Sequence, residues 1–387
     1  LRGARMFSLD SLAHAFNYDL AGRVVVAPGA LAAAAGSLAK AVGALAPELA
    51  TLAADPVVAA IAEALKGAER AVVLLGNSAQ RHPVRSALLN CAGLIAGFTG
   101  AKLGILTDGA NAAGAWLAGA VPHRLPGGEA VEKPGLDAAA MLGTPLAAYV
   151  LLGVDPDRDL ANPVRALAAL GSAACVVALS GYRSEALERI ATVLLPVAVF
   201  AENEGTYVNL CGQAQAFAAA VRPPGESRPA WKVLRALGER LGITGFDAVA
   251  LSDVSRGLPM ASGAGTWSAA GLKLVAVPMT ALSAICEIPM YAADALVRRA
   301  PALQQMPQAG DGRAYFAPDT LAELGIGAGE RLILKAGGAE AMLVAAVDEG
   351  VPAGCCRYYG ARGLMIDAET GAAVEVARAA SPRVSNA

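Results

Sequence analysis

The stretch that decides the fold is residues 191–242, ATVLLPVAVFAENEGTYVNLCGQAQAFAAAVRPPGESRPAWKVLRALGERLG. It opens with a short apolar run, residues 193–200, which is typical of a buried strand because it is rich in Val and Leu and bounded by breakers. Pro196 has no N–H to donate to a sheet, so we expect an edge or irregular strand. A polar loop that pivots on Gly205 follows, and Gly212 marks a second bend, since both glycines can adopt positive φ without steric cost.

Strands and helices alternate on either side of this run. A helix is predicted from near Pro229 to Gly242, because proline fits the first helical turn and glycine fits just past the last. Upstream, the predicted strands are residues 147–152 and 175–179, and the predicted helices are residues 163–170 and 184–190. This βαβ spacing predicts a parallel sheet with right-handed crossovers. Ligands bind at the carboxyl ends of such strands, where the loop 202–215 would lie.

The N-terminal third follows the same α/β pattern. Residues 1–23 are mixed in character, and they resemble the tail of a longer chain. The predicted strands are residues 24–26, 71–75 and 103–107, and the predicted helices are residues 31–45, 55–67 and 83–98. Gly76-Asn77-Ser78 after the second strand could cradle a phosphate, but the further glycines of a dinucleotide fingerprint are absent. A plain structural turn is the alternative.

The C-terminal part changes to a β pattern. Residues 246–284 are rich in Gly, Ser and Ala and predict an irregular connection with a weak strand or two. From Tyr315 onward, short strands separated by glycine turns predict a small β-barrel. We therefore expect an α/β protein with parallel-sheet domains and a C-terminal barrel. Its predicted segments are residues 1–133, 134–245, 246–305 and 306–387.

Composition and charge exclude several classes of function. The 387 residues are 55% hydrophobic and 17% charged, with a net charge of −2 and no basic stripe, so we expect a large core and no nucleic-acid partner. No apolar run reaches the ~18 residues of a membrane span, and nothing at the start has the pattern of a signal peptide. The six cysteines form no C-x-x-C pair, so they predict reduced buried thiols and no metal or iron–sulfur site.

Two loops carry a resemblance to a known family. The first contains Gly205-Thr206-Tyr207, Asn209, Gly212 and Gln215, and the second contains Asn111, Gly114, Gly119, Pro122 and the run 125–128. This series resembles the molybdopterin oxidoreductase superfamily, whose first loop lies near a pterin cofactor. The Glu and Arg of the family motif are Cys211 and Gln213 here, which removes a bidentate phosphate or carboxylate binder. His123, without a second ligand nearby, is expected to be structural.

A third segment narrows the resemblance. Ile288-Pro289-Met290-Tyr291, Asp294 and the run 297–304 resemble the G-subunit family of bacterial NADH-quinone oxidoreductases, respiratory complex I. The resemblance implies a C-terminal barrel of the double-psi type. It also implies iron–sulfur clusters in an N-terminal part outside this sequence and a molybdopterin-like part that acts as a scaffold. The implied partners are other peripheral-arm subunits, and the implied location is peripheral, on the cytoplasmic side of the inner membrane.

The resemblance leaves alternatives open. The chain could belong to an active molybdopterin-dependent oxidoreductase of the formate dehydrogenase type, or it could be a free-standing nucleotide-binding module. We expect no catalytic residue, no metal ligand and no cofactor in this part of the protein. If contacts to a ligand survive, the candidates are Gly205, Thr206, Asn209 and Gln215, although these residues could equally serve loop geometry and backbone hydrogen bonding.

Overall fold

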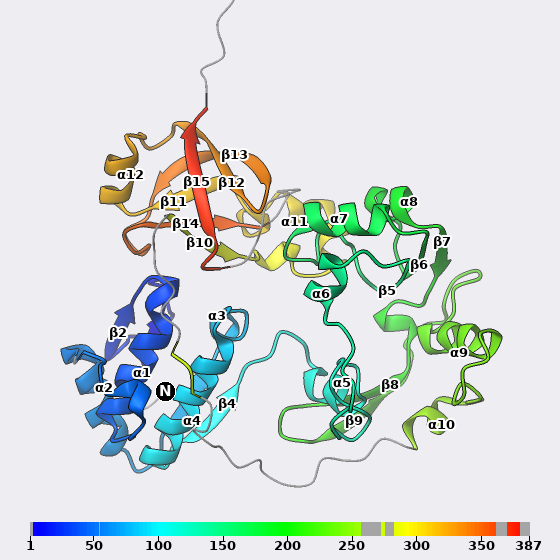
Figure 1. Cartoon of the computed structure of the whole chain (residues 1–387), viewed down its shortest axis with the longest axis horizontal. Coiled ribbons are helices and arrows are strands. Elements are labelled where there is room, and N and C mark those ends of the chain that lie inside the picture. Colours follow the sequence, from blue (N-terminus) through cyan, green and yellow to red (C-terminus); the bar gives the residue numbers. More distant parts are fainter. Residues whose placement is uncertain (1–2, 54, 257–271, 275–281, 361–369, 380–387) are drawn as a thin grey trace, which may run out of the picture. The chain divides into compact units, whose positions relative to one another are not determined.

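The computed structural model describes residues 3–53, 55–256, 272–274, 282–360 and 370–379. The chain forms two units, one made of Leu1–Leu106 with Gly265–Ala387 and the other of Thr107–Ala264 (Figure 1). The four consecutive segments 1–133, 134–245, 246–305 and 306–387 remain a prediction. Most of the weakly patterned stretch 257–281, and the tail from Ser381, lie outside the described residues.

The first unit begins with an α/β part. Its strands are β1 (Phe7–Asp10), β2 (Gly22–Val25), β3 (Val72–Leu75) and β4 (Lys102–Ile105), which form the parallel pairs β1–β2 and β3–β4. Its helices are α1 (Leu31–Ala41), α2 (Pro56–Lys66), α3 (Asn77–Gln80) and α4 (Arg85–Thr99), with the 3-10 turns η1 (Pro28–Ala30) and η2 (Pro47–Leu49). The predicted strand–helix–strand unit is confirmed. The expectation of a mixed tail over residues 1–23 missed β1, whose parallel partner is β2.

Local sequence explains where these helices begin and how they pack. The Oδ1 of Asp55 accepts hydrogen bonds from the amides of Val57 and Val58 at 2.7 and 3.0 Å, so Asp55 is the N-cap of α2, the helix predicted over residues 55–67. Ala39 and Ala62 are almost fully buried where α1, α2 and α4 form one apolar cluster. Small side chains at these positions allow the helix axes to approach closely.

A buried histidine links two segments of this part. His82 is 2% exposed, and its Nδ1 accepts a hydrogen bond from the Val84 amide at 3.2 Å. The Nε2 therefore carries the proton and donates to the carbonyl of Pro28 at 3.0 Å. Burial lowers the pKa of His82 from its ordinary value of 6.5, against an opposing effect of the Pro28 carbonyl.

The His82 arrangement predicts a loss of stability in acid. The folded pKa lies below the unfolded pKa of about 6.5, so below that pH the unfolded chain binds more protons than the folded chain. We expect the free energy of unfolding contributed by His82 to be full above about pH 6.5 and to fall as the pH drops through the folded pKa. Urea unfolding at a series of pH values should show this slope, and His82→Leu should flatten it. An unchanged slope in the variant would contradict the assignment.

The C-terminal part of the first unit is a closed six-stranded barrel, as predicted. Its strand order is β10-β14-β11-β13-β12-β15, with the pairs β10–β14 and β11–β13 parallel. The strands are β10 (Leu282–Glu287), β11 (Arg313–Phe316), β12 (Arg331–Ala336), β13 (Ala339–Val347), β14 (Cys355–Tyr359) and β15 (Ala373–Arg378), and α12 (Pro318–Leu324) follows β11 (Figure 1). β10 begins in the stretch 246–284, for which the sequence predicts an irregular connection with a weak strand or two.

The N-terminal segment of this unit packs on the barrel. Leu12 joins a small apolar cluster with Ile285 and Val351, and the Ala13 amide donates to the carbonyl of Gly350 at 3.0 Å. Residues from the start of the chain therefore complete the surface of a barrel formed by its C-terminal part. No local pattern in the first 23 residues signals this packing, because it depends on partners distant in sequence.

The second unit contains the predicted parallel sheet. Its elements are α5 (Ala112–Leu117), α6 (Ala138–Gly143), β5 (Ala148–Leu152), α7 (Pro163–Gly171), β6 (Cys175–Ser180), α8 (Glu185–Ile190), β7 (Val193–Pro196), η3 (Phe200–Glu202), β8 (Gly205–Val208), β9 (Ala214–Phe217), α9 (Ala230–Arg240) and α10 (Leu251–Ser255). The sheet order β5-β6-β7 is parallel throughout, so the strand that contains Pro196 is an edge strand, as predicted. Asn162 and Ser184 cap α7 and α8 through hydrogen bonds from the amides of Arg165 and Leu187.

All six cysteines are free thiols. Cys355 and Cys356 are consecutive residues of β14, and both are buried. Burial raises the pKa of the Cys355 thiol to about 11. Burial likewise raises the pKa of Cys91 to about 12, so the reactive thiolate is scarce at neutral pH. The expectation that the cysteines are buried is wrong for Cys211, which is exposed.

Candidate functional site

The loop that carries the family resemblance is a β-hairpin. β8 pairs antiparallel with β9 in the register Gly205–Phe217, Thr206–Ala216, Tyr207–Gln215 and Val208–Ala214. The sequence predicts a polar loop over these residues, and that prediction is wrong. All four side chains of β9 are exposed, and a strand without a buried side has no apolar alternation by which the sequence could be recognised.

Asn209 shapes the turn of the hairpin. Its Oδ1 accepts hydrogen bonds from the amides of Cys211 and Gln213, each at 3.0 Å, and its own amide donates to the carbonyl of Gln213 at 3.1 Å. Gly212 has a φ of +77°, so its predicted left-handed conformation is confirmed. Asn209 therefore organises backbone, while the Cys211 and Gln213 side chains are exposed.

Gly205 is needed for a reason other than positive φ. It lies in an extended strand, and a Cβ at this position would lie 3.0 Å from the Cζ of Phe217. The Phe217 ring also packs edge-on against Tyr207, with ring centroids 4.8 Å apart. The glycine thus makes room for an aromatic ring across the hairpin, and the expectation of a loop pivot is corrected.

The four candidate residues do not converge on one point. Directly paired residues in an antiparallel hairpin place their side chains on the same face, and neighbours in sequence alternate. Gln215 pairs with Tyr207 and Thr206 pairs with Ala216, so Thr206 and Gln215 lie on opposite faces. Both side chains are exposed, and Asn209 is occupied by its own turn. A ligand role for Gly205, Thr206, Asn209 and Gln215 remains a prediction.

The second resembling loop holds the hairpin in place. The Oδ1 of Asn111 accepts a hydrogen bond from the Val208 amide at 2.8 Å, which ties the N-terminus of α5 to β8 across 97 residues. Gly114 makes this possible, because a Cβ there would lie 2.0 Å from the same Asn111 oxygen. Figure 1 shows α5 beside β8 and β9. The two stretches that resemble the family are therefore parts of one structure.

The rest of that loop is closely packed backbone. Gly119 has a φ of +73°, and a Cβ there would lie 2.8 Å from the Pro126 nitrogen. Gly128 faces the Trp116 ring, which lies 2.5 Å from where a Cβ would be. The carbonyl of His123 accepts a hydrogen bond from the Val131 amide at 3.2 Å. These glycines serve close approach, which is a structural role.

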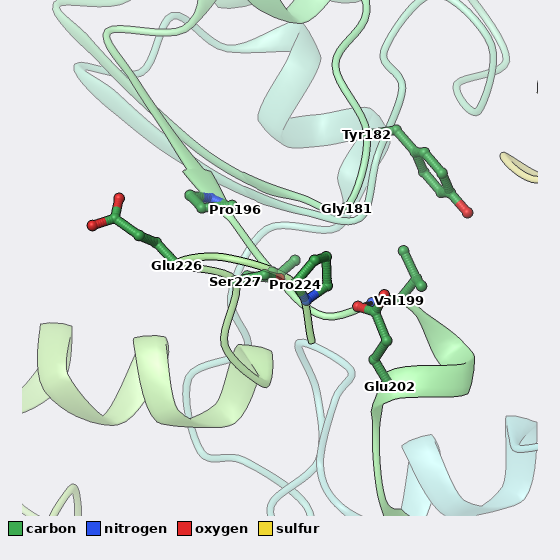
Figure 2. Close-up of a pocket in the computed structure, with 9 residues that line it drawn as sticks. Gly181, Tyr182, Pro196, Val199, Glu202, Pro224, Glu226 and Ser227 are labelled. Atoms are coloured by element: carbon green, nitrogen blue, oxygen red, sulfur yellow. Dashed lines mark hydrogen bonds between the residues drawn. The ribbon is translucent and has the colours of Figure 1, made fainter. Parts of the chain in front are cut away.

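A cavity of about 480 Å³ lies at the carboxyl ends of β6 and β7, where the parallel sheet predicts a ligand. Figure 2 shows its lining, which consists of Gly181, Tyr182, Pro196, Val197, Val199, Glu202, Pro224, Glu226 and Ser227. Of these, the sequence alone placed only the start of the 202–215 loop at this edge. Gly181-Tyr182 directly after a predicted strand and the turn Pro224-Gly225-Glu226 are the signals that could have found the others.

Hydrogen bonds between side chains and the backbone give the cavity a defined wall. A Cβ at Gly181 would lie 2.5 Å from the Cγ1 of Val199, so the glycine allows the two segments to meet. The Oε2 of Glu202 accepts a hydrogen bond from the Val199 amide at 3.0 Å. The Nδ2 of Asn203 donates to the carbonyls of Ala198 and Val199 at 2.9 and 3.1 Å. The segment after β7 is thus held by its own side chains.

The donors at this edge do not fit a pterin dinucleotide. Such a group carries phosphates, which are bound by cationic side chains or by several N–H donors. Among the described residues, those that line the cavity include two carboxylates, Glu202 and Glu226, and no Lys or Arg. Gln213 stands where the family motif has an arginine, and its side chain is exposed.

The third resembling segment is held by its own polar side chains. Asp294 accepts hydrogen bonds from the amides of Leu296 and Val297 at 2.8 and 2.9 Å. The Nε2 of Gln304 donates to the carbonyls of Tyr291 and Val297 at 2.8 and 2.9 Å. These bonds fold η4 (Met290–Ala292), η5 (Val297–Arg299) and α11 (Pro301–Gln304) onto one another. Asp294 and Gln304, which belong to the resembling segment, therefore hold these three short helices together.

Metal ligands and membrane spans are both missing from the described part of the chain. Within it, no group of three or more His, Cys, Asp or Glu is arranged to hold a metal ion. Among the same residues, the helices are too short or too polar for any of them to cross a membrane.

Comparison with known proteins agrees with this architecture. Residues 31–240 match the family described as molybdopterin oxidoreductase, and the chain belongs to that family. Within it, the chain is similar to the NADH-quinone oxidoreductase G subunit of Streptomyces coelicolor, with 36% identity over 185 residues, 42% of this chain and 21% of that protein. The mitochondrial NADH-ubiquinone oxidoreductase 78 kDa subunit of Candida albicans is 43% identical over 65 residues, 17% of this chain and 9% of that protein.

A solved structure, the acetylene hydratase from Pelobacter acetylenicus, aligns with 62% of this chain and 46% of its own at 14% identity. The TM-score is 0.45, and a likeness at that level carries no argument about fold or function. The aligned region of this chain spans only about a fifth of the length of the G subunit from Streptomyces coelicolor.

Proposed function

We propose that this chain is the molybdopterin-oxidoreductase-like part of a G subunit of an NADH-quinone oxidoreductase, and that it acts there as a scaffold. The complex would transfer electrons from NADH through FMN and iron–sulfur clusters to quinone, coupled to proton translocation. The observation that carries the proposal is the 36% identity over 185 residues to a subunit of that name. The clusters would lie in the N-terminal part of the subunit, outside this sequence.

The geometry supports a structural role for the resembling loops. The side-chain oxygens of Asn111 and Asn209 accept hydrogen bonds from backbone amides, and the carboxylate of Asp294 does the same in the third segment. Side-chain oxygens that accept backbone N–H groups stabilise turns, so these bonds serve the fold. The family motif therefore persists in this chain as backbone architecture, without the arginine that would bind a charged group.

The implied partners and location follow from the proposal. Other peripheral-arm subunits of the complex would contact this chain, which would lie peripherally on the cytoplasmic side of the inner membrane. Exposed apolar side chains such as Val150, Leu152 and Val193 lie on one face of the β5–β7 sheet. Parallel sheets are ordinarily covered on both faces, so further protein is expected there in the assembled state.

The test is purification of the natural protein from its own membranes through a tag on this chain. We expect flavin- and iron–sulfur-containing subunits to co-purify, with NADH-dependent quinone reduction in the same fraction. Elemental analysis should find iron without stoichiometric molybdenum. Recovery of this protein without those subunits would overturn the proposal.

The second candidate is an active molybdopterin-dependent oxidoreductase of the formate dehydrogenase type, which the family match favours. It requires a bound molybdenum centre. Molybdenum at close to one atom per chain in the purified natural protein would support this candidate, and absence of molybdenum from an intact complex would exclude it.

Thr206→Ala separates a structural role from a catalytic one. Thr206 is exposed on β8, so we expect its replacement to change the free energy of unfolding by no more than about 0.5 kcal/mol. The rate of NADH oxidation by the assembled complex should change by a smaller free-energy equivalent than the unfolding does. A large loss of turnover in a complex with normal subunit composition would show that the hairpin takes part in the reaction.

A further inference from the structure

The cavity at the carboxyl ends of β6 and β7 has a chemical character that the proposed scaffold role does not use. Its wall combines apolar side chains, from Pro196, Val197, Val199 and Pro224, with nearly as much polar surface. The Tyr182 side chain lies at one side (Figure 2). Two carboxylates, Glu202 and Glu226, are the charged side chains among its lining residues. A cavity that offers both apolar surface and carboxylates favours a ligand that combines an apolar stem with a cationic head.

The two carboxylates hold different positions. Figure 2 shows Glu202 reaching toward Val199 and Pro224, whereas the carboxylate of Glu226 is directed away from them. Glu202 is oriented by the hydrogen bond from the Val199 amide to its Oε2, and this bond leaves Oε1 as a further acceptor. Glu226 is exposed. The inner carboxylate is therefore preorganised, and the outer one contributes charge at the rim.

The Ser227 hydroxyl is a further polar group on the cavity wall. Ser227 lines the cavity and is only 8% exposed. Its amide donates to the Pro224 carbonyl at 3.1 Å and its carbonyl accepts from Arg228, but its hydroxyl has no partner among the residues the structure describes. Because the hydroxyl is not used by the fold and is open to the cavity, it can hydrogen-bond a group that is bound there.

We propose that this cavity binds an ammonium or guanidinium group carried on an aliphatic stem. The head donates hydrogen bonds to the Oε1 of Glu202 and to the Ser227 hydroxyl, and the stem packs on Val197, Val199 and the prolines. The same chemistry is presented by a free alkyl guanidine and by a Lys or Arg side chain of a neighbouring protein. The proposal is independent of the identity of the surrounding complex, so it can fail or succeed separately from the proposed function.

The test uses the full chain with ¹³C-labelled valine methyl groups, which makes Val197 and Val199 reporters of the cavity. Agmatine is titrated as the free cation, and acetyl-Gly-Arg-Gly-amide as the side chain on a peptide. We expect saturable shifts of both methyl pairs that weaken as salt is raised. Tighter binding of the peptide would identify a protein source for the group, and tighter binding of agmatine a small-molecule source.

Matched variants decide whether the named residues carry the binding. Glu202→Gln keeps an oxygen for the Val199 amide and removes the charge, so we expect agmatine binding to weaken about tenfold. Ser227→Ala removes the hydroxyl donor and acceptor and should weaken binding several-fold. Glu204→Gln makes the same charge change on a residue two positions away that does not line the cavity, and it should leave the affinity unchanged.

Three results would overturn the proposal. One is a linear, non-saturating response of the Val197 and Val199 methyls to both cationic probes. Another is a stronger response to inorganic phosphate than to agmatine, which would show that the cavity prefers an anionic ligand. The third is equal affinity in Glu202→Gln, Glu204→Gln and the unmodified chain. If Glu202→Gln does not fold, Ser227→Ala and the salt dependence decide.

Discussion

Replacing Phe316 with alanine is expected to lower the free energy of unfolding of the barrel by about 3–5 kcal/mol. Phe316 closes β11 and is fully buried in the apolar cluster that also contains Leu332 and Tyr358. A closed barrel cannot shift one strand to refill the space, because every strand is paired on both sides. The truncation therefore loses both the transfer free energy of the ring and the packing around it.

The Phe316 prediction is checked by urea unfolding together with amide hydrogen exchange of β11, β12 and β14. Since each 1.4 kcal/mol is tenfold in an equilibrium constant, exchange through global opening should accelerate by about two to four orders of magnitude. Phe200→Ala is the matched control, because Phe200 is 69% exposed and should change stability by no more than about 0.5 kcal/mol. Similar losses in the two variants would contradict the barrel core described above.

Replacing Gly119 with alanine should cost about 2–4 kcal/mol. Its φ of +73° imposes about 1–2 kcal/mol on any residue with a Cβ, and the added methyl would lie 2.8 Å from the Pro126 nitrogen. That neighbour is backbone in a turn closed by the hydrogen bond from the Gly127 amide to the Leu117 carbonyl at 2.7 Å, so it cannot yield cheaply. The strain should loosen α5 and, through Asn111, the hairpin.

Hydrogen exchange at the Val208 amide measures that effect directly, because its partner is Asn111. We expect faster exchange there in Gly119→Ala, together with a lower unfolding midpoint of the second unit. Gly171→Ala is the control: Gly171 ends α7, no atom lies within 4 Å of its would-be Cβ, and its φ is not in the left-handed region. An alanine there should be neutral or slightly stabilising. Unchanged exchange at Val208 in the Gly119 variant would refute the coupling.

Elements whose signals are local were predicted well. Asp55 before Pro56 places the start of α2, and apolar runs bounded by breakers place β5, β6 and β7. The parallel arrangement of those strands follows from helices at βαβ spacing, and it places a cavity at their carboxyl ends. Each of these inferences depends on interactions within a few residues or on the length of one connection.

The candidate site shows where local reasoning ends. Thr206 and Gln215 lie close in sequence on one hairpin, yet its register sends them to opposite faces. Gly205 is a residue type common in turns, but it lies in a strand, where Phe217 packs over it. β10 sits in a weakly patterned segment and becomes a strand by pairing with β14 and β15. In each case the partner is supplied by another part of the chain.

The amino-acid sequence of this protein was sufficient to specify an α/β chain with a parallel sheet, a C-terminal barrel and a family-like pair of loops. Helix caps, glycine turns and apolar periodicity are short-range preferences that the sequence displays directly. The folded chain alone brought Asn111 to Val208 across 97 residues and placed Glu202 and Ser227 around one cavity. Such contacts depend on strand register and on packing between distant segments, which change the neighbours of a residue without changing its local pattern.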